Sequence, residues 1–221
     1  TAKFKVFNEY DKALTYIRKC GVPIVIKANG LALGKGVYIC NTFKQAETAL
    51  KEILIKGIYK NAGDKVIIEK FLDGQEISIH AFCDGKTFTL LPPAQDHKSI
   101  HDGNKGKNTG GMGTIAPVPW VSKKLIEEVK QKVIIPALDG LHKRGRTFRG
   151  CLYPGLMITK EGPKVLEFNA RFGDPETQSY MRLLKTDLFD VLAACVDGTL
   201  SKLRIKWQKK FSCCIMLASA G

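Results

Sequence analysis

At 221 residues, 44% of them hydrophobic, the chain has enough apolar content to bury the core of one large domain or of two small ones. No apolar run is long enough to cross a membrane and no segment resembles a signal peptide, so we expect a cytoplasmic protein without a membrane partner. The formal net charge of +14 favours anionic partners, and the seven cysteines, odd in number and without a C-x-x-C pair, are typical of reduced packing residues.

Nucleic acid is the first candidate partner of so basic a chain. The Lys and Arg residues are dispersed, however, and no aromatic–basic motif of an RNA-binding domain occurs. Nucleotides and phosphorylated metabolites would account for part of the same charge. The sequence therefore argues against nucleic acid, and a basic nucleic-acid-binding module stays an alternative that a salt titration would test.

The first part of the chain mixes short strands with helices. The predicted elements are a helix from a cap at Asn8 to Gly21, strands over 23–28 and 37–40, a helix to about residue 56 that starts with a capping box of Thr42 and Gln45, and a strand over 64–71. A break near residues 72–75 is expected to separate this smaller lobe, residues 1–72, from a larger lobe over 73–200.

Hairpins dominate the second part. The predicted elements are strands over 76–80 and 87–91 with a turn at Asp84-Gly85, a long polar and glycine-rich loop over 94–113, a helix capped by Ser122 and interrupted near Pro136, a hairpin of strands over 151–158 and 164–169, helices capped by Asp174 and Thr186, and a strand with one basic face from Ser201. This mixture predicts an α+β fold with largely antiparallel sheets, in which two lobes clasp a nucleotide.

The strand that ends at Asn169 carries the first candidate site. Strict alternation would place Val165, Glu167 and Asn169 on one face and bury Leu166 and Phe168 on the other. A carboxylate and an amide oxygen two residues apart suit a hard divalent cation, which completes its shell with substrate phosphates. An ordinary amphipathic strand with a polar edge is the alternative interpretation.

A glycine-rich turn over residues 30–36 lies between two predicted strands. Its spacing differs from a Walker A loop and a strand follows it instead of a helix, while the H-R-D and D-F-G elements of protein kinases are absent. Such a turn can still lie over phosphates, with Lys27 and Lys35 as cationic partners. A flexible hairpin with solvent-exposed lysines is the alternative.

Two further segments combine polar groups with backbone that could meet a ligand. The stretch over 66–72, followed by Glu76, resembles a hinge that reads an adenine edge, although alone it is more typical of a half-exposed strand whose face holds Glu76, Ser78 and His80. The loop over 94–113 concentrates acidic, basic and glycine residues. A nucleophilic triad is a poor explanation of that loop, because no serine or cysteine has a matched base.

Five motifs in one order span nearly the whole chain: PIVIKANGLALGKGV, EKFLDGQEIS, PPAQDHK, NTGGMG and VLEFNARFGDPE. With them the chain resembles the ATP-grasp region of the phosphoribosylamine–glycine ligases, for which QDHK with NTGGMG and EFNARFGDPE are specific in combination. The final LASAG is similar to the start of that family's C-terminal domain. The resemblance thus implies that residues 201–221 begin a truncated C-terminal domain and that flanking domains of the same enzyme are missing.

The resemblance implies a role for each motif. The implied ATP-binding positions are Lys27, Lys35, Glu69, Leu72 and Glu76, and the implied ligands of Mg²⁺ or Mn²⁺ are Glu167 and Asn169. The implied substrate positions are Asp96, Asp102, Asn108, Thr109, Gly110, Gly111 and Asp174, and the implied catalytic positions are His97, Lys98 and Arg171. The chain departs from the family at Ser99, Asn104 and Lys107, where the family usually has arginine, aspartate and proline.

By this resemblance the expected reaction is ATP-dependent ligation of glycine to 5-phosphoribosylamine through a glycyl phosphate, a step of de novo purine synthesis. Phosphorylation makes the carboxylate a better electrophile, lysines and metal stabilise the moving phosphoryl group, and an enclosing loop excludes water. Another ATP-grasp ligase, such as a carboxylase or a carbamoyl-phosphate-forming enzyme, is the enzymatic alternative.

Overall fold

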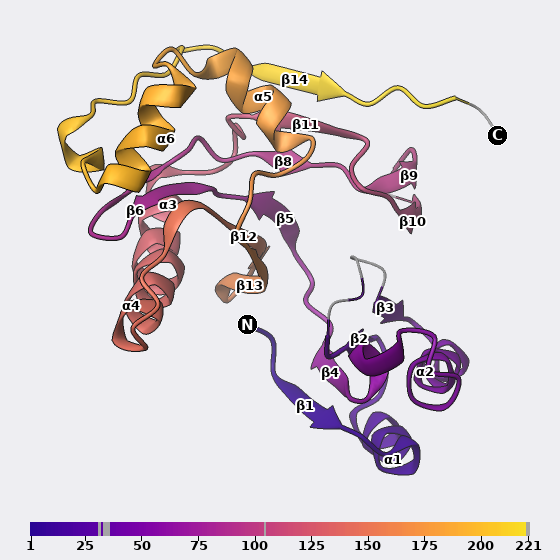
Figure 1. Ribbon diagram of the computed structural model, residues 1–221. Helices are drawn as coiled ribbons and strands as arrows, with labels where there is room; N and C mark the ends of the chain where they lie inside the picture. The colour runs from indigo at the N-terminus through magenta and orange to yellow at the C-terminus, as the bar shows by residue number, and fades with distance from the viewer. Residues whose placement is uncertain (31, 33–35, 104, 220–221) are drawn as a thin grey trace. The chain divides into compact units, whose positions relative to one another are not determined.

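The computed structural model describes residues 1–30, 32, 36–103 and 105–219, and all side chains among them except that of Lys107. The chain divides into two compact units, Thr1–Asp73 (unit 1) and Gly74–Gly221 (unit 2), each with its own sheets (Figure 1). Within the described part of the chain, no helix is both long and apolar enough to span a membrane.

Unit 1 is a four-stranded antiparallel sheet with helices on one face. Its elements are β1 (Phe4–Phe7), α1 (Tyr10–Cys20), β2 (Ile24–Ala28), β3 (Val37–Cys40), α2 (Phe43–Leu50), which continues as a π-helical turn (Lys51–Ile55), a 3₁₀ turn (Lys60–Gly63) and β4 (Val66–Lys70), in the sheet order β1-β4-β2-β3. Alternate residues such as Ile24, Ile26 and Ile68 point to the helices and form the core.

The opposite face of the unit 1 sheet is apolar and open. Phe4 and Val6 on β1 and Val37 and Ile39 on β3 are 46–52% exposed. The register aligns Phe4 and Ile39 with the inner strands of the same sheet, so these side chains surround the middle of one face. A sheet face with this much exposed apolar surface is typical of a binding surface.

Unit 2 is larger and is built around an antiparallel sheet. Its strands are β5 (Gln75–Ser78), β6 (Ala81–Asp84), β7 (Phe88–Leu90), β8 (Gln95–Asp96), β9 (Ser99–His101), β10 (Lys105–Asn108), β11 (Gly113–Ala116), β12 (Arg149–Thr159), β13 (Gly162–Asn169) and β14 (Ser212–Ile215). Its helices are α3 (Lys123–Val129), a π-helical turn (Lys130–Ile134), α4 (Ile135–Lys143), α5 (Glu176–Leu183), α6 (Leu188–Asp197) and a 3₁₀ turn (Leu200–Lys202). The main sheet has the order β13-β12-β6-β7 with β5 also paired to β12, and a smaller sheet has the order β14-β11-β8.

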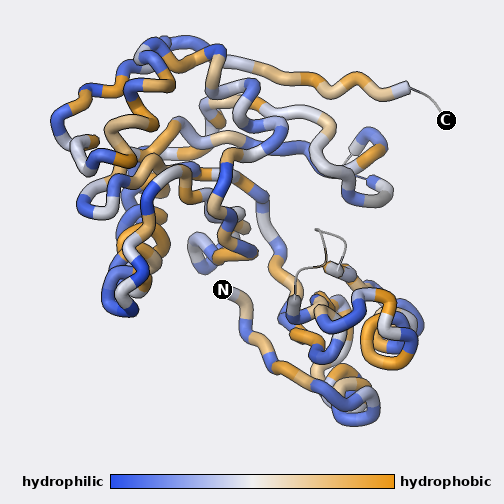
Figure 2. The backbone as a smooth tube through the Cα atoms, in the orientation of Figure 1, coloured by the Kyte–Doolittle hydropathy of each residue, from blue (hydrophilic) through white to orange (hydrophobic). Residues whose placement is uncertain are grey.

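Helices cover both sides of the main sheet of unit 2. Ala81 and Cys83 belong to a core with α3 and α4, whereas Phe82 belongs to a core with α5 and α6. Hydrophobic and hydrophilic stretches alternate along α3 and α4, as one-sided burial requires (Figure 2). The predicted α+β class with antiparallel sheets is confirmed.

Two of the five predicted helix caps were correct. Thr42 and Gln45 form the capping box of α2, and Ser122 accepts from the Leu125 N–H at the start of α3. The other three predictions were wrong by one residue, since the N-caps are Glu9, Pro175 and Asp187 in place of Asn8, Asp174 and Thr186. Two of the displaced side chains bond elsewhere: Asp174 accepts from the Gln178 side chain, and Thr186 Oγ1 accepts from the Lys206 N–H.

The predicted basic-faced strand from Ser201 was wrong. Leu203, Ile205 and Trp207 do pack against the core formed with α5 and α6, which explains their alternation. The backbone of these three residues is not part of a β-strand, and Trp207 makes only an isolated β-bridge to Leu184. The strand of this region lies later, at β14, which pairs with β11.

The segment over 94–113 is not one long loop. It contains β8, the β9–β10 hairpin and the approach to β11, and its backbone returns on itself at His97, whose N–H donates to the Gly113 carbonyl and whose carbonyl accepts from Met112. Asn104 lies outside the described residues.

Candidate functional site

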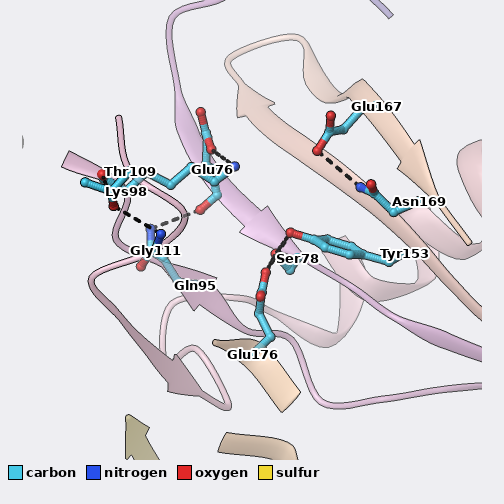
Figure 3. Close-up of polar contacts among 10 residues, drawn as sticks. All are labelled: Glu76, Ser78, Gln95, Lys98, Thr109, Gly111, Tyr153, Glu167, Asn169 and Glu176. Carbon is cyan, nitrogen blue, oxygen red and sulfur yellow. Dashed lines mark hydrogen bonds and ion pairs between the residues drawn. The ribbon is translucent and has the colours of Figure 1, made fainter. Parts of the chain in front are cut away.

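Three adjacent strands of unit 2 present polar side chains on one face. The register aligns Ser78 of β5 and Glu167 of β13 with Gly155 of β12, and aligns Asn169 with Tyr153. We call Glu76, Ser78, Tyr153, Glu167 and Asn169 the polar face (Figure 3). Gly155 lies between these side chains, and a Cβ at that position would make an ordinary van der Waals contact with Glu167 Cγ at 3.4 Å.

A register shift in the hairpin decides which residues join this face. Leu156 pairs with Val165 and Gly155 pairs with Glu167, so Leu166 is an extra residue of β13 at the shift. Val165 therefore packs into the core with α3 and α4, away from Glu167, and the prediction that both share a face was wrong. Phe168, predicted to be in the core, is 50% exposed.

Glu167 and Asn169 nevertheless lie together as predicted. The Asn169 amide donates from Nδ2 to Glu167 Oε1 at 3.1 Å, which leaves the Asn169 carbonyl oxygen available to a ligand. Among the described residues, no three His, Cys, Asp or Glu side chains gather into a site that could hold a metal. This oxygen pair fits a hard cation such as Mg²⁺ only if water and phosphate oxygens supply the remaining ligands, as is common for that ion.

Lys98 extends over the polar face from the end of β8. Its ammonium lies 3.3 Å from Glu76 Oε2, and the backbone carbonyl of Glu76 accepts from Gln95 Nε2 at 3.1 Å. Burial disfavours the charged ammonium, but the carboxylates of Glu76, Asp96 and Glu167 outweigh burial and raise the pKa of Lys98. Lys98 is thus held as a cation that interacts electrostatically with Glu167, one of the two candidate metal ligands.

Asp96, next to Lys98, has a buried carboxylate oxygen without a partner. Its Oδ1 makes no hydrogen bond, and only Thr114 Oγ1 shares that condition among the buried side-chain oxygens and nitrogens of the described residues. Burial, followed by the carboxylate of Glu176, raises the pKa of Asp96 to about 7. A buried acceptor of this kind is costly unless a ligand supplies a donor.

The NTGGMG segment folds back on Lys98. The Thr109 N–H and hydroxyl both donate to the Lys98 carbonyl, at 2.8 and 2.9 Å, and Thr109 Oγ1 accepts from the Gly111 N–H at 3.1 Å. Gly111 has a φ of +133°, and a Cβ there would collide with Asp96 and with the Pro175 ring. Glycine is therefore required for this loop to approach Asp96 closely.

Sequence reasoning missed a buried polar cluster at the inner end of the polar face. Ser78, His80 and Glu176 are at most 4% exposed, and Glu176 Oε1 accepts from the Ser78 hydroxyl at 2.8 Å and from the Tyr153 hydroxyl at 2.6 Å. The predicted half-exposed strand was wrong for Ser78 and His80, because α5 covers that side of the sheet. The polar alternation of β5 was a signal, but it does not tell solvent from a buried network.

Gly173 lies at the tightest point of this cluster. A Cβ there would collide with the Glu176 carboxylate and lie 2.9 Å from His80 Nε2. We expect Gly173→Ala to lower the free energy of unfolding by about 1–3 kcal/mol, as overpacking does. Gly110→Ala is the matched control, since open space surrounds that position, and urea denaturation of both variants measures the difference. Equal stability of the two variants would contradict the described packing.

Other predicted positions lie apart from these contacts. Five of them are exposed: His97, Asp102, Asn108, Gly110 and Asp174. Arg171 is exposed in the turn after β13 and donates from Nη1 to the Phe172 carbonyl at 2.9 Å. Lys35 lies outside the described residues, and with it most of the glycine-rich turn.

Unit 1 holds the remaining candidates. Lys27 Nζ lies 2.8 Å from Glu69 Oε2, and both side chains are less than one-fifth exposed. The pair lies on the open apolar face of the sheet, since Glu69 aligns with Phe4 and Lys27 with Val37. Leu72 is half-buried after the end of β4.

A larger cavity of unit 2 lies away from these residues. It has a volume of about 330 Å³ and lies between the β6–β7 turn and α4, where Phe88, Leu138, His142 and Phe148 line it. None of the predicted site residues lines it, whereas Glu76, Asp96, Lys98 and Tyr153 surround a cavity of only about 10 Å³. The candidate site is the polar face and not the larger cavity, because binding of phosphates and cations depends on oriented charged and hydrogen-bonding groups.

Comparison with known proteins places the chain in a family. Residues 1–177 match the family described as "Phosphoribosylglycinamide synthetase, ATP-grasp (A) domain". The chain is 46% identical, over its whole length, to a phosphoribosylamine–glycine ligase of Caldanaerobacter subterraneus, and it covers 53% of that relative. The chain thus spans about half the length of the curated relatives it matches.

Solved structures show the same fold. The crystal structure of the phosphoribosylamine–glycine ligase of Thermotoga maritima is similar with a TM-score of 0.78 and 37% identity, covering 90% of this chain and 50% of that one. The biotin carboxylase domain of a Hydrogenobacter thermophilus 2-oxoglutarate carboxylase, with a TM-score of 0.71 and 15% identity over 96% of this chain and 46% of that one, shares the fold alone. The predicted ATP-grasp fold is confirmed, and the chain belongs to the phosphoribosylglycinamide synthetase ATP-grasp (A) domain family.

Proposed function

We propose that this chain is the nucleotide- and metal-binding part of an enzyme that ligates glycine to 5-phosphoribosylamine with consumption of ATP. The observation that supports it best is the polar face of unit 2, where Asn169 donates to Glu167, and where Lys98 pairs with Glu76 at 3.3 Å and interacts electrostatically with Glu167. The sequence over which the family matches contains all four residues. The chemistry fits phosphoryl transfer, in which a cation and an ammonium neutralise charge on phosphate oxygens.

The open face of the unit 1 sheet is the proposed contact for the nucleotide. Its exposed apolar side chains suit a flat base, and Lys27 is proposed to meet the phosphates. Glu69 holds the Lys27 ammonium at 2.8 Å, so the lysine enters that role already oriented. With Leu72, these groups form the nucleotide contacts that we assign to unit 1.

In unit 2 the proposed roles divide between metal and substrates. A cation bound by Glu167 and Asn169 would neutralise charge on the nucleotide phosphates. Lys98 is proposed to stabilise the phosphoryl group as it moves to the glycine carboxylate, and Glu76 to position both Lys98 and the ribose. Asp96 is proposed to accept a hydrogen bond from a substrate amine, which would satisfy its buried Oδ1.

Substrate-dependent ADP release tests the proposed reaction. We expect ADP to form when glycine and 5-phosphoribosylamine are both present, with residues 1–221 carried in the full-length enzyme. Bicarbonate in place of glycine is the control, because a related fold serves a carboxylase. ADP release that needs bicarbonate and ignores glycine would overturn the proposal in favour of a carboxylase.

Asp96 gives the protein a predictable pH dependence. Its pKa is about 7 in the folded chain against 3.8 as its ordinary value, so the folded state binds the proton more tightly than the unfolded state. Its contribution to the free energy of unfolding is therefore constant below about pH 4, falls as pH rises from about 4 to about 7, and stays low above that window. We expect Asp96→Asn to remove this fall, measured by urea denaturation between pH 4 and pH 8. An unchanged pH profile in the variant would contradict the burial of Asp96.

A further inference from the structure

Tyr153 occupies the centre of the buried polar cluster. It is 5% exposed, and its hydroxyl donates to Glu176 Oε1 at 2.6 Å and lies 3.1 Å from the Ser78 hydroxyl oxygen, which donates to the same carboxylate. Burial, followed by the charge of Glu176, raises the pKa of Tyr153, so the phenol stays protonated and remains a donor. These bonds fix the hydroxyl end of the side chain.

The ring of Tyr153 is fixed as firmly as its hydroxyl. The His80 imidazole stacks on it, with ring centroids 4.0 Å apart and an interplanar angle of 18°. His80 Nε2 accepts from the Gly173 N–H at 3.1 Å, so in the neutral ring Nδ1 carries the proton and donates to the Tyr180 hydroxyl at 2.9 Å. Burial, followed by the charge of Arg171, lowers the pKa of His80 to about 3, which keeps the imidazole neutral.

The same cluster holds the turn that carries Arg171. His80 binds the backbone of Gly173, and Tyr153 binds Glu176 at the other end of the turn. The Arg171 guanidinium carbon lies 5.9 Å from the centroid of the Tyr153 ring, within the range of a cation–π contact. Tyr153 therefore reaches Arg171 by two routes, through the backbone of the turn and through the ring.

We propose that Tyr153 is a positioning residue, which holds the Arg171 guanidinium in place for an anionic group of a substrate without touching the reacting atoms. The inference rests on the proposed ligase function and on the catalytic role that the family resemblance implies for Arg171. A guanidinium binds carboxylate or phosphate in a bidentate geometry that tolerates little displacement. Contact with a fixed aromatic ring restricts the rotamers of an exposed Arg side chain and so orients its guanidinium.

A double-mutant cycle on Tyr153 and Arg171 in the full-length enzyme tests this role. Tyr153→Leu removes the ring, and we expect the KM of the anionic substrate that Arg171 binds to rise about 3- to 30-fold. Tyr153→Phe keeps the ring and should hold that KM near the native value, although the melting temperature falls. In an Arg171→Ala background, Tyr153→Leu should raise the KM no further. Measuring KM for ATP, glycine and 5-phosphoribosylamine separately shows whether the anion is a carboxylate or a phosphate.

Tyr180→Phe is the matched control, because it removes the hydroxyl that bonds to His80 and leaves the Tyr153 ring in place. A KM increase from Tyr180→Phe as large as that from Tyr153→Leu, or a KM increase from Tyr153→Leu that persists without Arg171, would overturn the inference alone. No effect of Arg171→Ala on kcat or on any KM would overturn both the inference and the proposed role of Arg171. If the Leu variant does not fold, a fluorinated phenylalanine at position 153 keeps the ring's size, weakens its attraction for a cation and is expected to raise the same KM.

Discussion

Replacing Glu167 by Gln is expected to remove most of the gain in ATP affinity that Mg²⁺ provides, with a loss of at least ~10-fold. The substitution keeps the size of the side chain and its hydrogen bond with Asn169, but removes the negative charge that a hard cation prefers. Calorimetric titration of ATP with and without Mg²⁺ measures the effect.

Glu127→Gln is the control for the change in net charge, because Glu127 is exposed on α3 and pairs with Lys130. We expect that variant to bind Mg²⁺ and ATP as the native chain does. If Glu167→Gln did the same, Glu167 would not be a metal ligand, and the polar face would have another use.

Removing the Lys27 ammonium is expected to lower the affinity for ATP by roughly 10- to 100-fold, because a charge-assisted hydrogen bond to phosphate is lost. Adenosine has no phosphate, so its affinity should hardly change. Lys27→Met alone, however, leaves the Glu69 carboxylate without the ammonium that now lies 2.8 Å away. The informative variant is therefore Lys27→Met with Glu69→Gln, which removes both charges of the pair.

Glu69→Gln alone completes this comparison. If Glu69→Gln lowers the affinity for ATP as much as the double variant does, the carboxylate and not the lysine contacts the nucleotide. An equal loss of ATP and adenosine in the double variant would point to a disturbed sheet, and melting temperatures of all three variants would show it.

The sequence predicted those parts of the fold that are determined by interactions between residues close together in the chain. The capping box of Thr42 and Gln45 and the hairpin of β12 and β13 depend on neighbours in the chain, and both were confirmed. The pairing of Glu167 with Asn169 was also predicted, because two residues of spacing place side chains on the same face of a strand. Val165 was misplaced, since a register shift in a hairpin leaves no reliable mark in the sequence.

The rest of the candidate site depends on contacts between distant segments. Glu176 lies in the first turn of α5, where an exposed acidic residue is common, yet it is 1% exposed and accepts a hydrogen bond from Ser78, 98 positions earlier. Tyr153 and His80 stack because β12 pairs with β5 and β6 in a register that places them opposite each other. The tail at Leu203 and Ile205 shows the same limit, since alternation reports one-sided burial and not strand pairing.

The transfer of an oxygen atom from glycine to phosphate tests the central claim most directly. If the polar face of unit 2 serves phosphorylation of the glycine carboxylate, attack of the amine on the acyl carbon expels phosphate that keeps one carboxylate oxygen. With ¹⁸O-labelled glycine, ATP and 5-phosphoribosylamine, the account predicts that the full-length enzyme releases inorganic phosphate carrying one ¹⁸O atom, and that Glu167→Gln abolishes this transfer. Release of unlabelled phosphate alongside the ligated product would contradict it.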